Sequence, residues 1–166
     1  MPKLYFRYGT MNSSKTANLL MVAHNYTIQN KRVLLLKPAV DTRPTDSRTI
    51  ESRVGIVKKV DLLVTPTTNI LDELRVLASL VPVICYGLRT DYRMRFFPGS
   101  RRLMEVADTV EEIKTTCSYC NRKAIVNAKF FINTEGQRVI VRNGTDVVEL
   151  GAEDKYMPMC FNCWKV

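Results

Sequence analysis

Residues 9–16 read "GTMNSSKT", a run of small polar residues that ends in lysine and threonine. A Walker A phosphate loop has the pattern G-x-x-x-x-G-K-[ST]. Its backbone N–H groups cradle phosphates, its lysine reaches the outer phosphates, and its hydroxyl binds magnesium. Gly9, Lys15 and Thr16 match, whereas Ser14 replaces the second glycine. If that position needs a positive φ, a serine there is strained by about 1 kcal/mol. This run therefore predicts binding of a nucleoside triphosphate.

The flanks of this run supply the setting that a phosphate loop requires. Leu4–Tyr8, "LYFRY", is a short apolar run typical of a buried strand. From Thr16 onward the apolar residues follow helical spacing, at Leu19, Leu20, Ala23 and Ile28. The alternative interpretation is an ordinary helix start, with Ser13 or Ser14 as the N-cap and the lysine in solvent.

Four of the five cysteines form two C-x-x-C pairs, Cys117/Cys120 and Cys160/Cys163. Each pair can offer two thiolates to one Zn²⁺, and together they complete a tetrahedral shell. Because no ligand position is left for water, we expect a structural zinc site. The alternative is two unrelated buried or redox-active pairs.

The other residues that could do chemistry are few. Cys85 lies inside an apolar run and is expected to be a core thiol, and His24, the single histidine, lies on the first predicted helix. A catalytic triad built on histidine is therefore excluded, and we expect His24 to be structural.

Composition gives only a broad limit on function. The chain has 166 residues, 46% of them apolar and 25% charged, as in an ordinary folded domain. The net charge of +9 favours a phosphate-bearing partner, either a nucleotide or a nucleic acid. No apolar run approaches 18 residues and the first residues do not resemble a secretory leader. We expect a cytoplasmic protein without a membrane partner, with free or metal-bound cysteines.

Further elements complete an α/β pattern. Val33–Leu36 and Val81–Tyr86 are continuous apolar runs, typical of strands covered on both faces of a parallel sheet. Asn69–Leu80 predicts an amphipathic helix with Asn69 as N-cap, and residues 101–113 predict another. The expected fold is a parallel sheet flanked by helices.

The character of the sequence changes after Cys117. Turn signals at Glu135-Gly136 and Asn143-Gly144 separate β-rich runs and predict hairpins. We therefore predict two domains, a P-loop nucleotide-binding α/β domain at 1–116 and a small β-rich zinc-binding domain at 117–166.

Four stretches together resemble a known family. They are "LYFRYGTMNSSKTANLL", "KPAVDTRPTDSRTIESRVG", "VPVICYGLRTDYRMRFFPGSRRLMEVAD" and the paired cysteines around "GAEDKYMPMC". In this order they resemble the cytosolic zinc-containing thymidine kinases, specifically the bacterial branch, and the likeness covers nearly the whole chain. It favours the phosphate-loop interpretation.

The resemblance implies an enzyme of thymidine salvage for DNA synthesis, which transfers the γ-phosphoryl group of ATP to the 5′-hydroxyl of thymidine or deoxyuridine. It implies ATP and Mg²⁺ as catalytic cofactors, structural Zn²⁺, no nucleic-acid partner, and a homotetramer. Lys15 would act in catalysis on the outer phosphates, with Thr16 near magnesium. The residues implied to hold ATP are Gly9, Thr10, Met11, Asn12, Ser13, Ser14, Lys15, Thr16, Asp41 and Arg43.

The resemblance also implies a nucleoside site. The region from Cys117 to Cys163 resembles a zinc-tied lasso over the base, with Tyr156 near the sugar and the backbone at 148–151 on the thymine edge. The implied substrate residues are Met11, Leu88, Tyr92, Val148, Glu149, Leu150, Gly151 and Tyr156.

One part of the family pattern is missing. The resemblance implies an apolar strand that ends in Asp-Glu, whose aspartate helps to hold magnesium and whose glutamate is the general base. This sequence has only "NILDELRVLASL" there. We interpret this as a segment near Leu74-Arg75 that is either deleted or not represented in this sequence, although Asp72 and Glu73 are an alternative pair. A chain without both carboxylates would be nearly inactive, because a general base alone supplies about 10²–10⁴ in rate.

Two other functions remain open. The basic charge and four cysteines fit a zinc-ribbon module that binds nucleic acid, and loss of the acidic pair fits an inactive paralogue that still binds nucleotide. A phosphate loop between strand and helix favours the kinase, since a nucleic-acid module does not need one.

Overall fold

The computed structural model describes residues 1–41, 46–65, 70–145 and 155–166. The chain divides into two compact units, Met1–Ser13 with Leu71–Val166, and Ser14–Ile70. Each is described by itself. The predicted domain boundary after residue 116 falls inside the first unit and stays a prediction.

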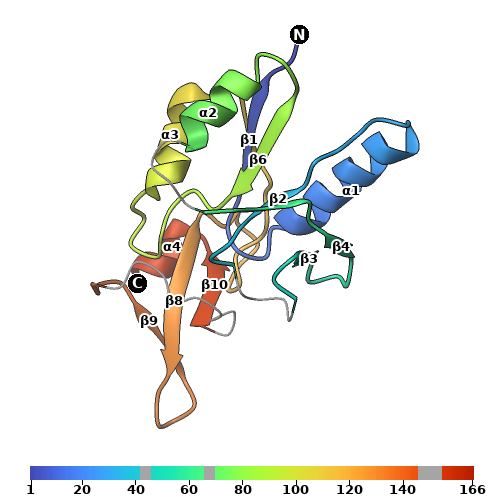
Figure 1. Cartoon of the computed structure of the whole chain (residues 1–166). Helices are drawn as coiled ribbons and strands as arrows, with labels where there is room; N and C mark the ends of the chain where they lie inside the picture. Colours follow the sequence, from blue (N-terminus) through green and yellow to red (C-terminus); the bar gives the residue numbers. More distant parts are fainter. Residues whose placement is uncertain (42–45, 66–69, 146–154) are drawn as a thin grey trace. The chain divides into compact units, whose positions relative to one another are not determined.

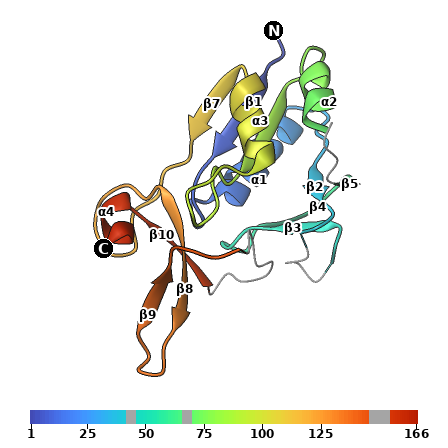
Figure 2. The same ribbon diagram turned by 90° about the vertical axis from the view of Figure 1, so that its left-hand side faces the viewer.

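A parallel sheet forms the centre of the first unit, with the order β6-β1-β7 (Figures 1 and 2). Its strands are β1 (Leu4–Tyr8), β6 (Val83–Gly87) and β7 (Thr109–Glu112). Leu4 and Phe6 are fully buried and pack with Ala78 and Leu103, at the end of α2 (Ile70–Leu77) and in α3 (Pro98–Val106). The predicted parallel sheet flanked by helices is confirmed, and the predicted first strand is exact in both bounds.

The helix predicted over residues 101–113 is wrong in its second half. α3 begins earlier, with Pro98 in its first turn, and ends at Val106. The residues that follow form β7, because Thr109 and Val110 pair in parallel with β1 and the Asp108 carboxylate accepts a hydrogen bond from the Leu4 amide at 2.8 Å. Thr109 and Val110 are β-branched residues, which favour strands, and they lie next to an edge of β1 that can accept a partner. Sheet pairing therefore outweighs the helical spacing of the apolar residues.

An antiparallel sheet with the order β10-β8-β9 completes the first unit (Figure 1). It consists of β8 (Val126–Ile132), β9 (Arg138–Val141) and β10 (Tyr156–Met159), and α4 (Phe161–Lys165) follows it. The predicted turn at Glu135-Gly136 joins β8 to β9, with Gly136 at φ 76°. The turn predicted at Asn143-Gly144 does not join paired strands among the described residues, since β10 pairs with β8.

The second unit holds α1 (Lys15–Ile28) and four short strands. β2 (Leu36–Pro38) pairs in parallel with β5 (Leu62–Val64), and β3 (Thr49–Glu51) forms a hairpin with β4 (Val57–Lys59), which the sequence analysis did not predict. Leu20 and Ala23 of α1 pack with Leu35 and Val60.

The strand predicted at Val33–Leu36 is shifted toward the C-terminus. It begins at Leu36, because the Leu35 amide instead donates to the Asp61 carboxylate at 2.7 Å. The expectation that both faces are covered is wrong here, since Leu34 is 69% exposed. None of the helices in the described part of the chain is long and apolar enough to cross a membrane.

Candidate active site and metal centre

The predicted phosphate loop follows β1, which ends at Tyr8, and precedes α1, which begins at Lys15. Gly9 is buried, and its amide donates to the Gly87 carbonyl at the end of β6 at 3.3 Å. A β-carbon at position 9 would collide with the Ile113 carbonyl and the Ser13 hydroxyl. Only glycine therefore fits at the first position of the loop.

Two loop residues have left-handed backbone conformations, Asn12 with φ 63° and Ser14 with φ 59°. Ser14 occupies the N-cap position of α1, yet its side chain makes no capping hydrogen bond. The first turn of α1 carries no acidic residue. These observations do not favour Ser14 as a capping residue, and they leave the helix N-terminus suited to an anion.

The loop after β6 carries Leu88 and Tyr92, which the resemblance placed at the nucleoside. Tyr92 is 1% exposed, and the ring faces the Arg93 guanidinium and the Lys129 ammonium group at 5.6 and 5.4 Å. The buried Asp91 carboxylate orders the loop, because it accepts hydrogen bonds from the backbone amides of Arg93 and Arg95 and from the Arg93 side chain.

A hollow in the first unit brings several of these segments together. It is lined by Tyr8, Gly9, Thr10, Arg89, Thr90, Glu112, Ile125 and Asn127. The residues come from the ends of β1 and β7, from the start of the phosphate loop, from the loop after β6 and from β8 with the residue before it. The sequence analysis missed Asn127, although a polar side chain inside the apolar run "AIVNAKFF" was a usable signal. Tyr156 of β10 is 8% exposed and pairs with Lys129 of β8.

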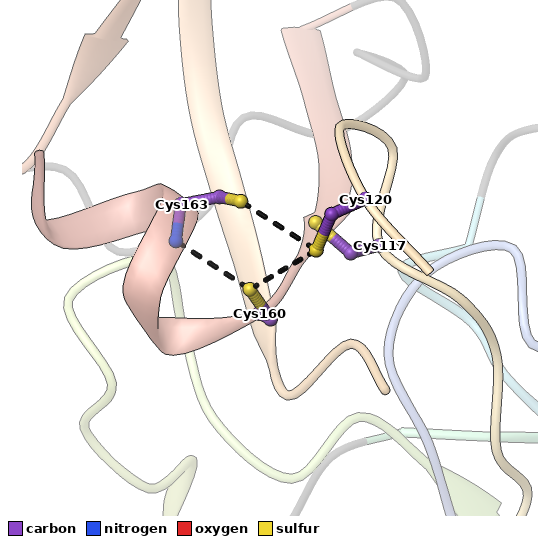
Figure 3. A group of neighbouring side chains, drawn as sticks. All are labelled: Cys117, Cys120, Cys160 and Cys163. Carbon is purple, nitrogen blue, oxygen red and sulfur yellow. Dashed lines mark hydrogen bonds between the residues drawn. The ribbon is translucent and has the colours of Figure 1, made fainter. Parts of the chain in front are cut away.

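The four predicted metal ligands converge (Figure 3). All four sulfurs lie within 4.8 Å of one another, and Cys120 Sγ is 3.7 Å from the Sγ atoms of Cys160 and Cys163. Tetrahedral zinc with Zn–S bonds of about 2.3 Å separates its sulfurs by about 3.8 Å. The donor set and spacing therefore fit Zn²⁺, and all four cysteines are free thiols.

The electrostatics of the cluster favour a cation. Burial opposes ionisation of Cys117, but nearby backbone N–H groups outweigh burial and lower the pKa of this thiol to about 6. The Cys163 amide similarly lowers the pKa of Cys160. Hydrogen bonds to Cys160 and Cys120 raise the pKa of Cys163 to about 12. A bound metal ion would supply the positive charge that lets the last thiol ionise.

The structure does not bring together the whole predicted site. Lys15, Thr16 and Asp41 belong to the second unit, so their placement against the nucleoside residues stays a prediction. The remaining predicted residues lie outside the described residues, namely Arg43, Val148, Glu149, Leu150 and Gly151.

The alternative acidic pair lies in the first turn of α2. The Asp72 side chain is 56% exposed and its carboxylate pairs with the Arg102 guanidinium of α3 at 2.7 Å. Glu73 is also exposed. An exposed carboxylate already paired with arginine is a weak candidate for a metal ligand, so these contacts do not favour the alternative.

Comparison with known proteins covers almost the whole chain. The family model described as thymidine kinase matches residues 2–78 and 67–164, so residues 67–78 are matched twice. The thymidine kinase of Streptococcus gordonii is 35% identical over 188 positions, covering 96% of this chain and 94% of the relative. That of Streptococcus agalactiae is 32% identical over 187 positions, covering 96% and 95%.

These alignments are longer than the part of this chain that they cover. In the Streptococcus agalactiae alignment, 96% of 166 residues is about 159, against 187 positions, so roughly 28 positions hold no residue of this chain. The match with the family nevertheless extends from residue 2 to residue 164. With its phosphate loop, its four converging cysteines and these relatives, the chain belongs to the thymidine kinase family.

Proposed function

We propose that the chain binds ATP at residues 9–16 and directs its γ-phosphoryl group to the 5′-hydroxyl of thymidine or deoxyuridine. The family match supports this reaction, and the backbone of the loop is the single structural observation that carries it. After β1 the chain passes through Gly9 and two residues with left-handed backbone conformations into α1, whose first turn has no acidic residue. A loop and helix N-terminus of this kind are suited to bind phosphate.

The reaction requires positioning and charge neutralisation more than covalent chemistry from the protein. In this proposal the Lys15 ammonium group neutralises the outer phosphates, and the Thr16 hydroxyl and Asp41 carboxylate offer oxygens to Mg²⁺. Mg²⁺, when bound, neutralises charge that develops on the phosphates. Leu88, Tyr92 and Tyr156 would hold the nucleoside, and Arg43 and the backbone at 148–151 would contribute as the resemblance implies.

No carboxylate of the described residues is assigned as the general base. The doubly matched residues 67–78 and the roughly 28 unmatched positions support an absent segment in this part of the chain. By the resemblance, this segment would carry the Asp-Glu pair. We therefore propose that the chain keeps nucleotide binding, with turnover reduced by about 10²–10⁴ from lack of a base.

The test measures ATP binding and ADP release with thymidine as acceptor and 5′-deoxythymidine as the control that lacks the hydroxyl. We expect the chain to bind ATP. Lys15→Ala should weaken this binding at least tenfold, because it removes a charged contact to phosphate. Lys31→Ala is the control and should leave ATP binding unchanged. Insertion of the Streptococcus gordonii segment at residues 67–78 should raise thymidine phosphorylation by about 10²–10⁴. Tight DNA binding without ATP binding would contradict the proposal and favour the zinc-ribbon alternative.

Two further properties belong to this proposal. The family resemblance implies a homotetramer. The five free thiols suit the reducing cytoplasm.

A further inference from the structure

Asn127 is a buried amide in an apolar strand. It is 4% exposed, and its neighbours Val126 and Ala128 are fully buried. A buried amide is costly unless its oxygen and nitrogen both find partners. The Asn127 Oδ1 atom accepts a hydrogen bond from the Met11 amide at 2.7 Å, and its Nδ2 atom donates to the Thr90 carbonyl at 2.9 Å. One side chain therefore joins two backbone segments that lie far apart in the sequence.

The two segments belong to the two halves of the proposed reaction. Met11 lies in the loop that would hold ATP, and the resemblance also implies a contact between Met11 and the nucleoside. Thr90 lies between Leu88 and Tyr92, which would face the nucleoside. The Asp91 carboxylate and the bridge between Thr90 and Phe96 already order the second segment. Asn127 is thus the link between an ordered loop on the acceptor side and residues 9–13 of the phosphate loop, which belong to the same compact unit.

The metal centre holds the strand that carries Asn127. Asn127 pairs with Pro158 of β10, and the Ile125 amide donates to the Met159 carbonyl at 2.9 Å. Cys160 follows Met159 directly, and the Ser118 amide, next to Cys117, donates to the Pro158 carbonyl. Both cysteine pairs therefore fix the register of β8 at Asn127.

We propose that Asn127 is a positioning residue, through which the zinc-tied sheet sets the phosphate loop against the nucleoside-binding loop. The inference rests on the proposed function and deepens it. Asn127 acts through Met11 and Thr90. A shift of about 1 Å between two reacting groups can cost about 10²-fold in rate, so a link between the two loops controls turnover more than the binding of either substrate.

The test compares Asn127→Ala and Asn127→Asp with Asn133→Ala, a control in the β8–β9 turn whose side chain also accepts from two backbone amides. Zinc content, amide hydrogen exchange at residues 9–13, and steady-state kinetics are measured on each full-length protein. In Asn127→Ala we expect unchanged zinc content, Met11 exchange at least tenfold faster, and kcat about 10- to 100-fold lower, with less than threefold change in KM for thymidine.

Asn127→Asp separates the two hydrogen bonds. Its carboxylate still accepts from the Met11 amide, so exchange at Met11 should stay slow. Its second oxygen cannot donate to the Thr90 carbonyl, so kcat should still fall.

Three results would overturn the inference: Met11 exchange in Asn127→Ala as slow as in the unaltered protein, loss of zinc together with activity, or kinetics equal to those of Asn133→Ala. If the unaltered protein does not phosphorylate thymidine, the kinetics are measured on the form that carries the Streptococcus gordonii segment. If that form is also inactive, the proposed function fails, whereas hydrogen exchange still decides whether Asn127 holds the phosphate loop.

Discussion

Ser14 has φ 59° and ψ 26°, a conformation that glycine adopts without strain. A residue with a β-carbon pays about 1–2 kcal/mol in this region, partly offset because glycine loses more entropy on folding. The strain is placed where the phosphate-loop pattern has glycine.

We predict that Ser14→Gly stabilises the protein by about 0.5–1 kcal/mol, measured as the free energy of unfolding in urea. Asn30→Gly is the matched control. Asn30 also has a left-handed backbone, with φ 58°, but asparagine tolerates it better than serine does. A decrease in stability for Ser14→Gly would show that the serine side chain contributes more than its backbone strain costs.

Individual site residues differ in how well the sequence reveals them. The four cysteines could be predicted because zinc fixes both residue type and spacing. The apolar run around Asn127 marks this residue, but its role could not be predicted, because its partners are a backbone amide and a backbone carbonyl, which leave no mark in the sequence at positions 11 and 90.

The helices and strands also differ in how well the sequence predicts them. β1, α1 and β6 were predictable because each carries a clear apolar pattern, although the strand predicted at Val81–Tyr86 is observed as Val83–Gly87. The helix predicted over residues 101–113 was half wrong because Val110 fits a helical stripe and a strand equally well, and only pairing with β1 decides between them. β2 and β5 are three residues each and depend on one another for their hydrogen bonds.

The β10-β8 pair depends on the cysteine cluster, so its stability should follow metal content. We predict that Cys163→Ser lowers zinc from about one ion per chain to nearly none and destabilises β8 and β10, because three thiolates bind zinc more weakly than four. Metal analysis and hydrogen exchange of residues 126–132 measure both effects.

Cys85→Ala is the matched control. Cys85 lies in β6, where burial raises the pKa of its thiol to about 11, and it is not part of the cluster. The Cys85→Ala protein should keep its zinc. Equal zinc content in Cys163→Ser and Cys85→Ala would show that the four sulfurs do not share an ion.

At the scale of the whole molecule, large apolar side chains remain exposed on both units, including Met21 and Val57 in one and Val76 and Phe131 in the other. Such surface commonly marks contacts between subunits. We predict a homotetramer, with a mass by light scattering of about four times 19.0 kDa. A monomer at micromolar concentration would contradict this prediction.

The C-terminal end of α2 and the segment between α2 and β6 carry a strip of exposed apolar residues, made of Val76, Leu80 and Val81, which are 70%, 73% and 47% exposed. Val76 is one of the doubly matched residues 67–78, and Leu80 and Val81 follow them in the sequence. Chaperones and proteases select chains by surface of this kind, and they do not sense a missing carboxylate. The abundance of this protein in a living cell therefore depends on what covers the strip, separately from whether the protein can turn over its substrates.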